Sequence, residues 1–223
     1  MNGREAVLSR IRQSLGVTGT EASRRREVEG RLADIPRGVI PARGQLPPAE
    51  RIELFVHQAE RSLASLERVP TADLLPEAIA MYLRARNLPA ELKRGDDPRL
   101  ASLPWERAPH LAIASGPSGG RDLVAVSHAE SGVAESGTLV LVSGPDNPTT
   151  LNFLPDYHLV VLAAADVVGD YETAFDRIRA RFGKGVLPRT VNLVTGPSRS
   201  GDIEQKLLLG AHGPRSLHIL LVG

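Results

Sequence analysis

Short runs of β-branched and aliphatic residues alternate with helical patterns through the second half of this chain. The runs lie at about 89–93, 110–115, 123–128, 138–143, 158–164, 190–195 and 216–222. Between the later runs, apolar residues spaced three and four apart predict a helix over 171–182, and a second helix is predicted over 200–209. Strands separated by helices at this spacing predict an α/β fold with a mostly parallel sheet and helices on both faces.

The first part of the chain is predicted to be a helical extension of that domain. A short amphipathic helix is expected over 4–15, with an apolar stripe made of Val7, Leu8, Ile11 and Leu15. We expect this stripe to be buried on its own domain, on a second copy or on a partner. Residues 17–47 are rich in Gly, Pro, Arg and Glu and predict a linker or extended arm. Two longer helices are predicted from Pro48 and from Thr71, so the expected domains are 1–46 and 47–223.

Composition excludes several classes of function. The chain has 223 residues, 42% of them hydrophobic, and its 27 basic and 26 acidic side chains leave a formal charge of +1, which disfavours nucleic acid as a partner. There is no cysteine, so thiolate metal sites and iron–sulfur clusters held by this chain are excluded. The six histidines form no close ligand pair, and we expect no metal and no cofactor. No signal-like or membrane-length apolar segment is found, and we expect a cytoplasmic protein.

The segment 196–204, Gly-Pro-Ser-Arg-Ser-Gly-Asp-Ile-Glu, follows the predicted strand at 190–195. Free backbone N–H groups at the start of a helix, small residues and a guanidinium together favour an anion site. The ligand-binding candidates of this segment are Gly196, Ser198, Arg199, Ser200 and Asp202. The alternative is that a serine merely caps the predicted helix, while Arg199 pairs with Asp202 or Glu204.

A second motif, Glu135-Ser136-Gly137-Thr138, precedes the predicted strand at 138–143. Glu135 is a candidate nucleophile or general base, with Ser136, Gly137 and Thr138 as ligand-binding neighbours. Glu130 lies five residues earlier, so two carboxylates could flank one turn. Equally, Glu135 could only accept hydrogen bonds from backbone amides in a turn.

The third motif is Gly210-Ala211-His212-Gly213-Pro214, just before the last predicted strand. His212 is a catalytic candidate because an imidazole can titrate near neutrality, and Gly213 is a ligand-binding candidate. The alternative is that Gly210 ends a helix and His212 binds a backbone carbonyl. A structural role is favoured for His158, which opens the predicted strand at 158–164.

These motifs, in this order and with Leu154-Pro155-Asp156-Tyr157-His158 between them, resemble the LUD-domain family and, within it, the C-type lactate-utilization proteins. The opening Arg4-Glu5-Ala6-Val7-Leu8 is also similar to that family. The resemblance implies a fold like that of the sugar-phosphate isomerase and CoA-transferase superfamily. Ser136 stands where the family commonly has Thr, and Ser200-Gly201 stands where it commonly has Thr-Ala; each change keeps a hydroxyl.

The resemblance further implies a place in the oxidation of L-lactate to pyruvate beside two iron–sulfur proteins, of the A and B types. We therefore expect a lactate-utilization subunit that binds a small carboxylate or other anion, with a homo-oligomer as one option. Two alternatives stay open: an autonomous CoA-transferase-like or acyl-transfer enzyme that uses Glu135, and a non-catalytic assembly subunit. Because strand-end loops meet at one sheet edge, Glu135, Ser198, Arg199 and His212 are predicted to converge.

Overall fold

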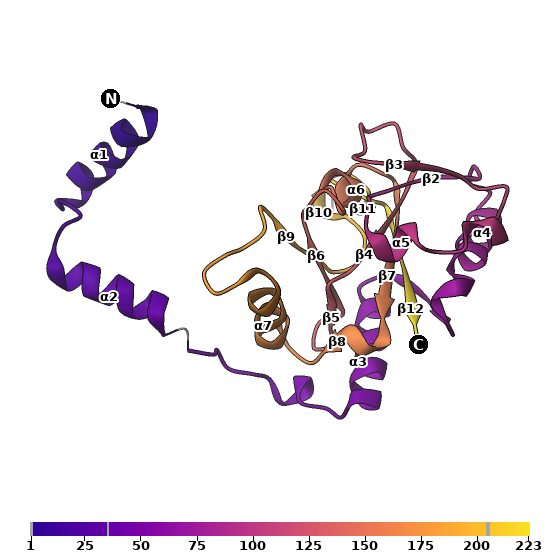
Figure 1. Ribbon diagram of the computed structural model, residues 1–223, viewed down its shortest axis with the longest axis horizontal. Helices are drawn as coiled ribbons and strands as arrows, with labels where there is room; N and C mark the ends of the chain where they lie inside the picture. Colours follow the sequence, from indigo (N-terminus) through magenta and orange to yellow (C-terminus); the bar gives the residue numbers. More distant parts are fainter. Residues whose placement is uncertain (1, 35, 204–205) are drawn as a thin grey trace. The chain divides into compact units, whose positions relative to one another are not determined.

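A six-stranded parallel sheet forms the centre of the part of the chain from Ile40 to Gly223 (Figure 1). The computed structural model describes residues 2–34, 36–203 and 206–223, with the backbone alone for 201–203 and 206–208. The sheet has the order β1-β12-β7-β4-β2-β3. Its strands are β1 (Ser65–Val69), β2 (Glu91–Arg94), β3 (Ala112–Ser115), β4 (Val124–His128), β7 (Tyr157–Ala163) and β12 (Ser216–Val222). The predicted α/β class with a mostly parallel sheet is confirmed.

Alternate residues of the central strands enter two separate cores, which explains why these strands are apolar on both faces. On β7, Leu159 and Val161 pack with helix α4 (Leu75–Ala85), whereas Val160 and Leu162 pack toward helix α3 (Pro48–Arg61). The two helices therefore cover opposite faces of the sheet. The prediction of helices on both faces is confirmed.

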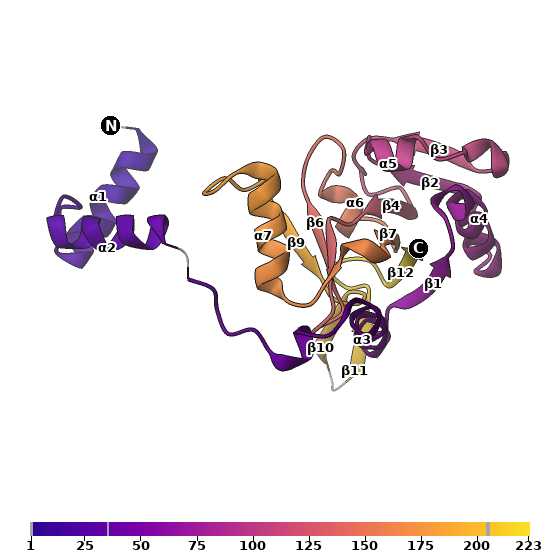
Figure 2. The same cartoon turned by 60° about the horizontal axis from the view of Figure 1, so that its bottom comes forward.

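A second, smaller sheet packs on the α3 side (Figure 2). It has the order β8-β5-β6-β9, with β8 (Val167–Val168), β5 (Ser131–Val133), β6 (Thr138–Val142) and β9 (Val191–Val194). Its outer face is covered by helix α7 (Tyr171–Phe182), through a core that includes Ala174 and Ile178. Two short helices, α5 (Pro98–Ala101) and α6 (Thr150–Phe153), lie in the loops.

The prediction of a helix over 200–209 is wrong. Strand β10 (Arg199–Ile203) instead pairs antiparallel with β11 (Lys206–Leu209). Ser200, Gly201 and Asp202 all have low helix propensity, and the glycine alone costs about 1 kcal/mol in a helix interior. Strands β1, β5 and β8 were also missed, because each is five residues or shorter and carries no clear alternation.

The first part of the chain, Met1–Val39, forms a separate unit with helices α1 (Gly3–Leu15) and α2 (Ala22–Ala33). The expected linker over 17–47 is wrong where α2 lies, since Arg, Glu and Ala are good helix formers and Glu27 pairs with Arg31 one turn on. Neither helix has a buried residue. Three of the four residues of the α1 stripe are exposed, with Val7 58%, Ile11 48% and Leu15 62% accessible, and Leu8 is partly buried.

Two glycines let loops approach the carboxyl end of helix α3 more closely than any other residue allows. Gly137 has φ +67°, and a Cβ there would lie 2.3 Å from the Ala59 backbone nitrogen. Gly196 has φ +70°, and a Cβ there would lie 1.9 Å from the Ser62 carbonyl oxygen. Both obstacles are backbone atoms, so a side chain at either position must move the loop or the helix.

We expect Gly196→Ala to lower the free energy of unfolding by roughly 2–4 kcal/mol, because the left-handed backbone and the clash with Ser62 both oppose it. Gly119→Ala is the matched control, since a Cβ at Gly119 meets no atom within 4 Å. Urea unfolding of the two variants measures the difference. Equal stability of both would show that the loop does not depend on this close approach.

Candidate functional site

A cavity of about 290 Å³ lies beside the amino ends of β7 and β12 and the carboxyl end of β9. Five of the predicted site residues line it, namely Gly196, Ser198, Arg199, His212 and Gly213. They belong to the first and third motifs, which lie in two loops more than ten residues apart in the sequence. Its other walls are contributed by residues 152–153, 158, 193–195, 197, 214 and 217.

Ser198 holds the two loops of this cavity together. Its backbone N–H donates to the Pro214 carbonyl at 2.8 Å, and its own carbonyl accepts from the Gly210 N–H at 2.9 Å. Its Oγ accepts from the His212 backbone N–H at 3.2 Å. Gly213 fits against the Ser198 side chain, with 3.4 Å between a Cβ built on the glycine and the serine Cβ. Ser198 thereby sets where Arg199 and His212 enter the cavity wall.

The electrostatic character of the cavity comes from Arg199 and His212, which are both exposed. No ion pair joins Arg199 to a residue whose side chain the structure describes. The side chain of Asp202 lies outside the described residues, as does that of Glu204. The proposed helix cap at Ser198 or Ser200 is excluded, because the backbone from Arg199 onward is a strand. Because the backbone from Arg199 is a strand, the helix dipole expected from this segment is not available, and an anion would rely on the guanidinium.

The floor of the cavity carries two buried polar residues that sequence reasoning did not select as ligand-binding. Asn152 is 1% exposed and His158 is 0% exposed, and both line the cavity. Ser127 joins them: its Oγ lies 3.1 Å from Asn152 Oδ1 and 3.0 Å from His158 Nε2. The remaining atoms, Asn152 Nδ2 and His158 Nδ1, are sealed from solvent and have no hydrogen-bond partner among the described residues. Nothing in the single sequence marked them, since a lone Asn and a strand-opening His are ordinary core residues.

The relay through Ser127 leaves a complementary pair of hydrogen-bonding groups. Burial lowers the pKa of His158 to about 3, so its ring is neutral and carries a single N–H. If the serine donates to Asn152, His158 donates from Nε2, which leaves an acceptor at Nδ1 and the amide N–H₂ as donor. In the reverse direction the roles exchange. In both cases one donor and one acceptor remain unpaired among the described residues, beneath the surface of the cavity floor.

Glu135 does not line this cavity. It is buried, at 7% exposed, and its Oε1 accepts from the Tyr171 backbone N–H at 3.2 Å, at the first residue of helix α7. A carboxylate there meets the positive end of the helix dipole. Glu130, the second carboxylate considered, pairs with Arg181 instead and lies beyond the other end of strand β5. The structure therefore brings together three of the four residues predicted to converge and leaves Glu135 with a helix terminus.

The rest of the Glu-Ser-Gly-Thr motif supports the cavity wall. Thr138 Oγ1 lies 2.7 Å from Ser136 Oγ, 2.8 Å from the Tyr171 hydroxyl and 2.7 Å from Thr195 Oγ1. Thr195 directly precedes Gly196 and lines the cavity. Ser136, Gly137 and Thr138 thus lie one layer behind the site.

Comparison with known proteins agrees with this architecture. Residues 120–222 match the LUD domain family. The cavity and all three motifs lie within the matched residues. The predicted family resemblance is confirmed.

The curated relatives include lactate utilization protein C of Geobacillus sp. (strain WCH70), 36% identical over 100 residues, and that of Bacillus subtilis (strain 168), 37% identical over 100 residues. The aligned segment covers 44% of this chain and 42% of each relative.

A solved structure, that of a DUF162 family protein from Deinococcus radiodurans, shares the fold. It superposes with a TM-score of 0.60 at 22% identity, covering 80% of this chain and 99% of that one. Among the described residues, no group of three or more side chains is placed to hold a metal ion. Of the helices described, none combines the length and apolarity needed to span a bilayer.

The buried histidines make stability depend on pH. Burial lowers the pKa of His158 to about 3 and that of His218 to about 4, whereas a histidine in water has a pKa of 6.5. Below pH 6.5 the unfolded chain binds protons that the folded chain does not, so stability falls as the pH falls toward 4. Each residue contributes up to about 1.4 kcal/mol per pH unit in this window.

We therefore expect the free energy of unfolding to fall by about 3–4 kcal/mol between pH 7 and pH 5, measured by urea unfolding. His218→Gln should lower the slope by up to about 1.4 kcal/mol per pH unit, and replacement of the exposed His57 by Gln should leave it unchanged. A slope that is flat over this range in the unchanged chain would contradict the burial of neutral imidazoles.

Proposed function

We propose that this protein acts in lactate utilization by binding a small 2-hydroxy acid such as L-lactate in the cavity lined by Arg199 and His212. The observation that carries the proposal is the exposed guanidinium of Arg199 at the cavity rim, which forms no ion pair with a residue whose side chain the structure describes. The names of the aligned relatives, lactate utilization protein C, support the same direction.

The carboxylate of L-lactate fits the rim of the cavity. It accepts hydrogen bonds, and a guanidinium binds such a group through two parallel N–H donors.

We propose that the oxidation itself involves partner proteins that hold iron–sulfur clusters. This chain has no cysteine, so it supplies no thiolate ligand for a cluster. Its contribution is then to hold the acid and present it, as a subunit of the system.

The acyl-transfer alternative receives no support from the geometry. A nucleophilic carboxylate must reach a bound substrate, and Glu135 is buried against the amino end of α7 outside the cavity. Its contacts favour a structural role.

We expect Arg199→Ala to weaken binding of L-lactate about ten- to a hundredfold, because a charge-assisted contact of roughly 1.5–3 kcal/mol is lost. Isothermal titration calorimetry with the full chain measures the dissociation constant. The thermal midpoint should change little, since Arg199 is exposed.

Arg189→Ala is the control for this experiment, because Arg189 is exposed and does not line the cavity. It removes the same charge and should leave the affinity unchanged. Absence of L-lactate binding to the unchanged protein, or equal affinities of all three proteins, would overturn the proposal.

A further inference from the structure

The strand order of the large sheet reverses between β2 and β4. From β2 the chain moves outward to β3, then returns past β2 to β4 and continues to β7 and β12. In an open parallel sheet, the crevice at the carboxyl ends of the strands beside such a reversal is where ligands usually bind. The Arg199 cavity lies elsewhere, near the amino ends of β7 and β12. The crevice at the reversal is thus a second, independent place to examine.

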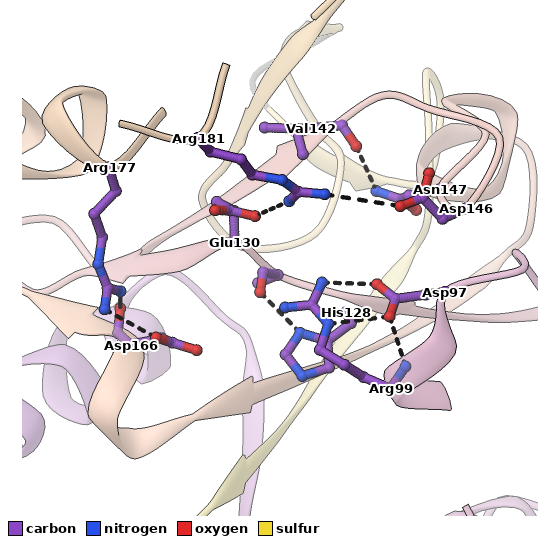
Figure 3. A network of polar contacts seen from close by, with 11 residues as sticks. Asp97, Arg99, His128, Glu130, Val142, Asp146, Asn147, Asp166, Arg177 and Arg181 are labelled. Atoms are coloured by element: carbon purple, nitrogen blue, oxygen red, sulfur yellow. Dashed lines mark hydrogen bonds and ion pairs between the residues drawn. The ribbon is translucent and has the colours of Figure 1, made fainter. Parts of the chain in front are cut away.

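His128, the last residue of β4, presents an unpartnered acceptor in this crevice (Figure 3). Its Nδ1 lies 2.8 Å from the Ala129 carbonyl oxygen, to which it can only donate. Burial, and then the charge of Arg99, lower the pKa of His128, so the ring is neutral and Nε2 has no proton. No hydrogen bond to Nε2 is found among the described residues. Nε2 is also not among the buried side-chain atoms that are sealed from solvent and lack a partner.

Arg99 supplies donors next to this acceptor, and its charge is already compensated. Its Nε and Nη2 donate to the two oxygens of Asp97, at 3.0 and 2.7 Å, and Asp97 is 4% exposed. The N–H groups of Nη1 are not used in that pair. Arg181 on α7 is likewise held by Glu130 and, at 3.8 Å, by Asp146. Among the residues that the structure describes, both guanidinium groups of the crevice are therefore compensated, and neither selects an anion.

His128 and Arg99 both line two hollows. One, of about 210 Å³, is polar and includes Asp146, Asn147 and Arg181. The other, of about 430 Å³, is walled mainly by apolar side chains, among them Leu75, Leu103, Val161 and Val222. An apolar hollow with one acceptor and one set of donors at its end matches the general pattern of small-molecule sites.

We propose that this crevice is a second ligand site, which takes an uncharged molecule with an apolar body and a hydroxyl head. The hydroxyl donates to His128 Nε2, its oxygen accepts from Arg99 Nη1, and the apolar body fills the larger hollow. An anionic head gains little from Arg99, because Asp97 already neutralises it. The ion-pair network around the crevice holds α5, β4 and α7 in place and so fixes the two groups.

The test uses three probes of similar size on the full chain: phenol, toluene and benzoate. Phenol carries the hydroxyl, toluene lacks a donor, and benzoate carries a charge. We expect phenol to bind this crevice, as followed through the His128 resonance, about three- to tenfold more tightly than toluene or benzoate, the range one neutral hydrogen bond supplies. Phenol should also move the 15N resonance of His128 Nε2, while the resonances of His218, which lines none of the described cavities, stay in place.

Two variants complete the test. His128→Phe keeps the ring volume and should remove the preference for phenol, whereas His57→Phe, at an exposed histidine that lines none of the described cavities, should leave it intact. A preference that survives in His128→Phe, equal binding of phenol and toluene, or an unmoved His128 resonance in the unchanged protein would each overturn the proposal. Because the measurement on the unchanged chain stands alone, poor folding of His128→Phe does not decide the outcome.

Discussion

The close approach of two loops to the carboxyl end of helix α3 is the constraint on which the Arg199 cavity depends. Gly137 and Gly196 reach the same helix end from different strands, each against backbone atoms. Between them, Thr138 and Thr195 bond at 2.7 Å, so the two loops are held to each other as well as to the helix. The residue after this contact is Gly196, and three positions later Arg199 enters the cavity. The position of a functional guanidinium is thus set by glycines that touch no ligand.

The two sites proposed at different edges of the sheet differ in charge. At the amino ends, Arg199 stands without a described counter-ion, and that cavity favours an anion. At the carboxyl ends, Arg99 and Arg181 are each held by a carboxylate, and that crevice favours an uncharged head. The number of arginines alone would suggest the opposite, because the crevice has more of them. Pairing decides the electrostatic character, since a neutralised guanidinium still donates hydrogen bonds but attracts an anion weakly.

Much of the fold follows from local pattern. The apolar runs at 123–128, 158–164 and 216–222 became the central strands, and 171–182 became helix α7 with the bounds expected. Asp170 caps that helix through the Thr173 N–H at 2.8 Å, a signal contained within four residues. The helix prediction for 200–209 failed because the spacing of apolar residues suited a helix. The segment instead forms a hairpin, next to backbone hydrogen bonds that Ser198 makes with Gly210 and Pro214. Tertiary contacts of that kind have no signature in a single sequence.

Only the site residues that belong to the glycine-containing sequence motifs could be predicted. Ser198, Arg199 and His212 were found because glycine, proline and charged residues are concentrated in loops that carry function. Asn152 and His158 were missed because each is buried in a strand or short helix, where the default role is packing. Their meaning appears only when Ser127 is seen to use one side of each, leaving the other side unpaired. A buried polar atom without a partner costs about 1–3 kcal/mol, so the two atoms left unpaired beneath this cavity lower the stability of the fold and are no part of an ordinary packed core.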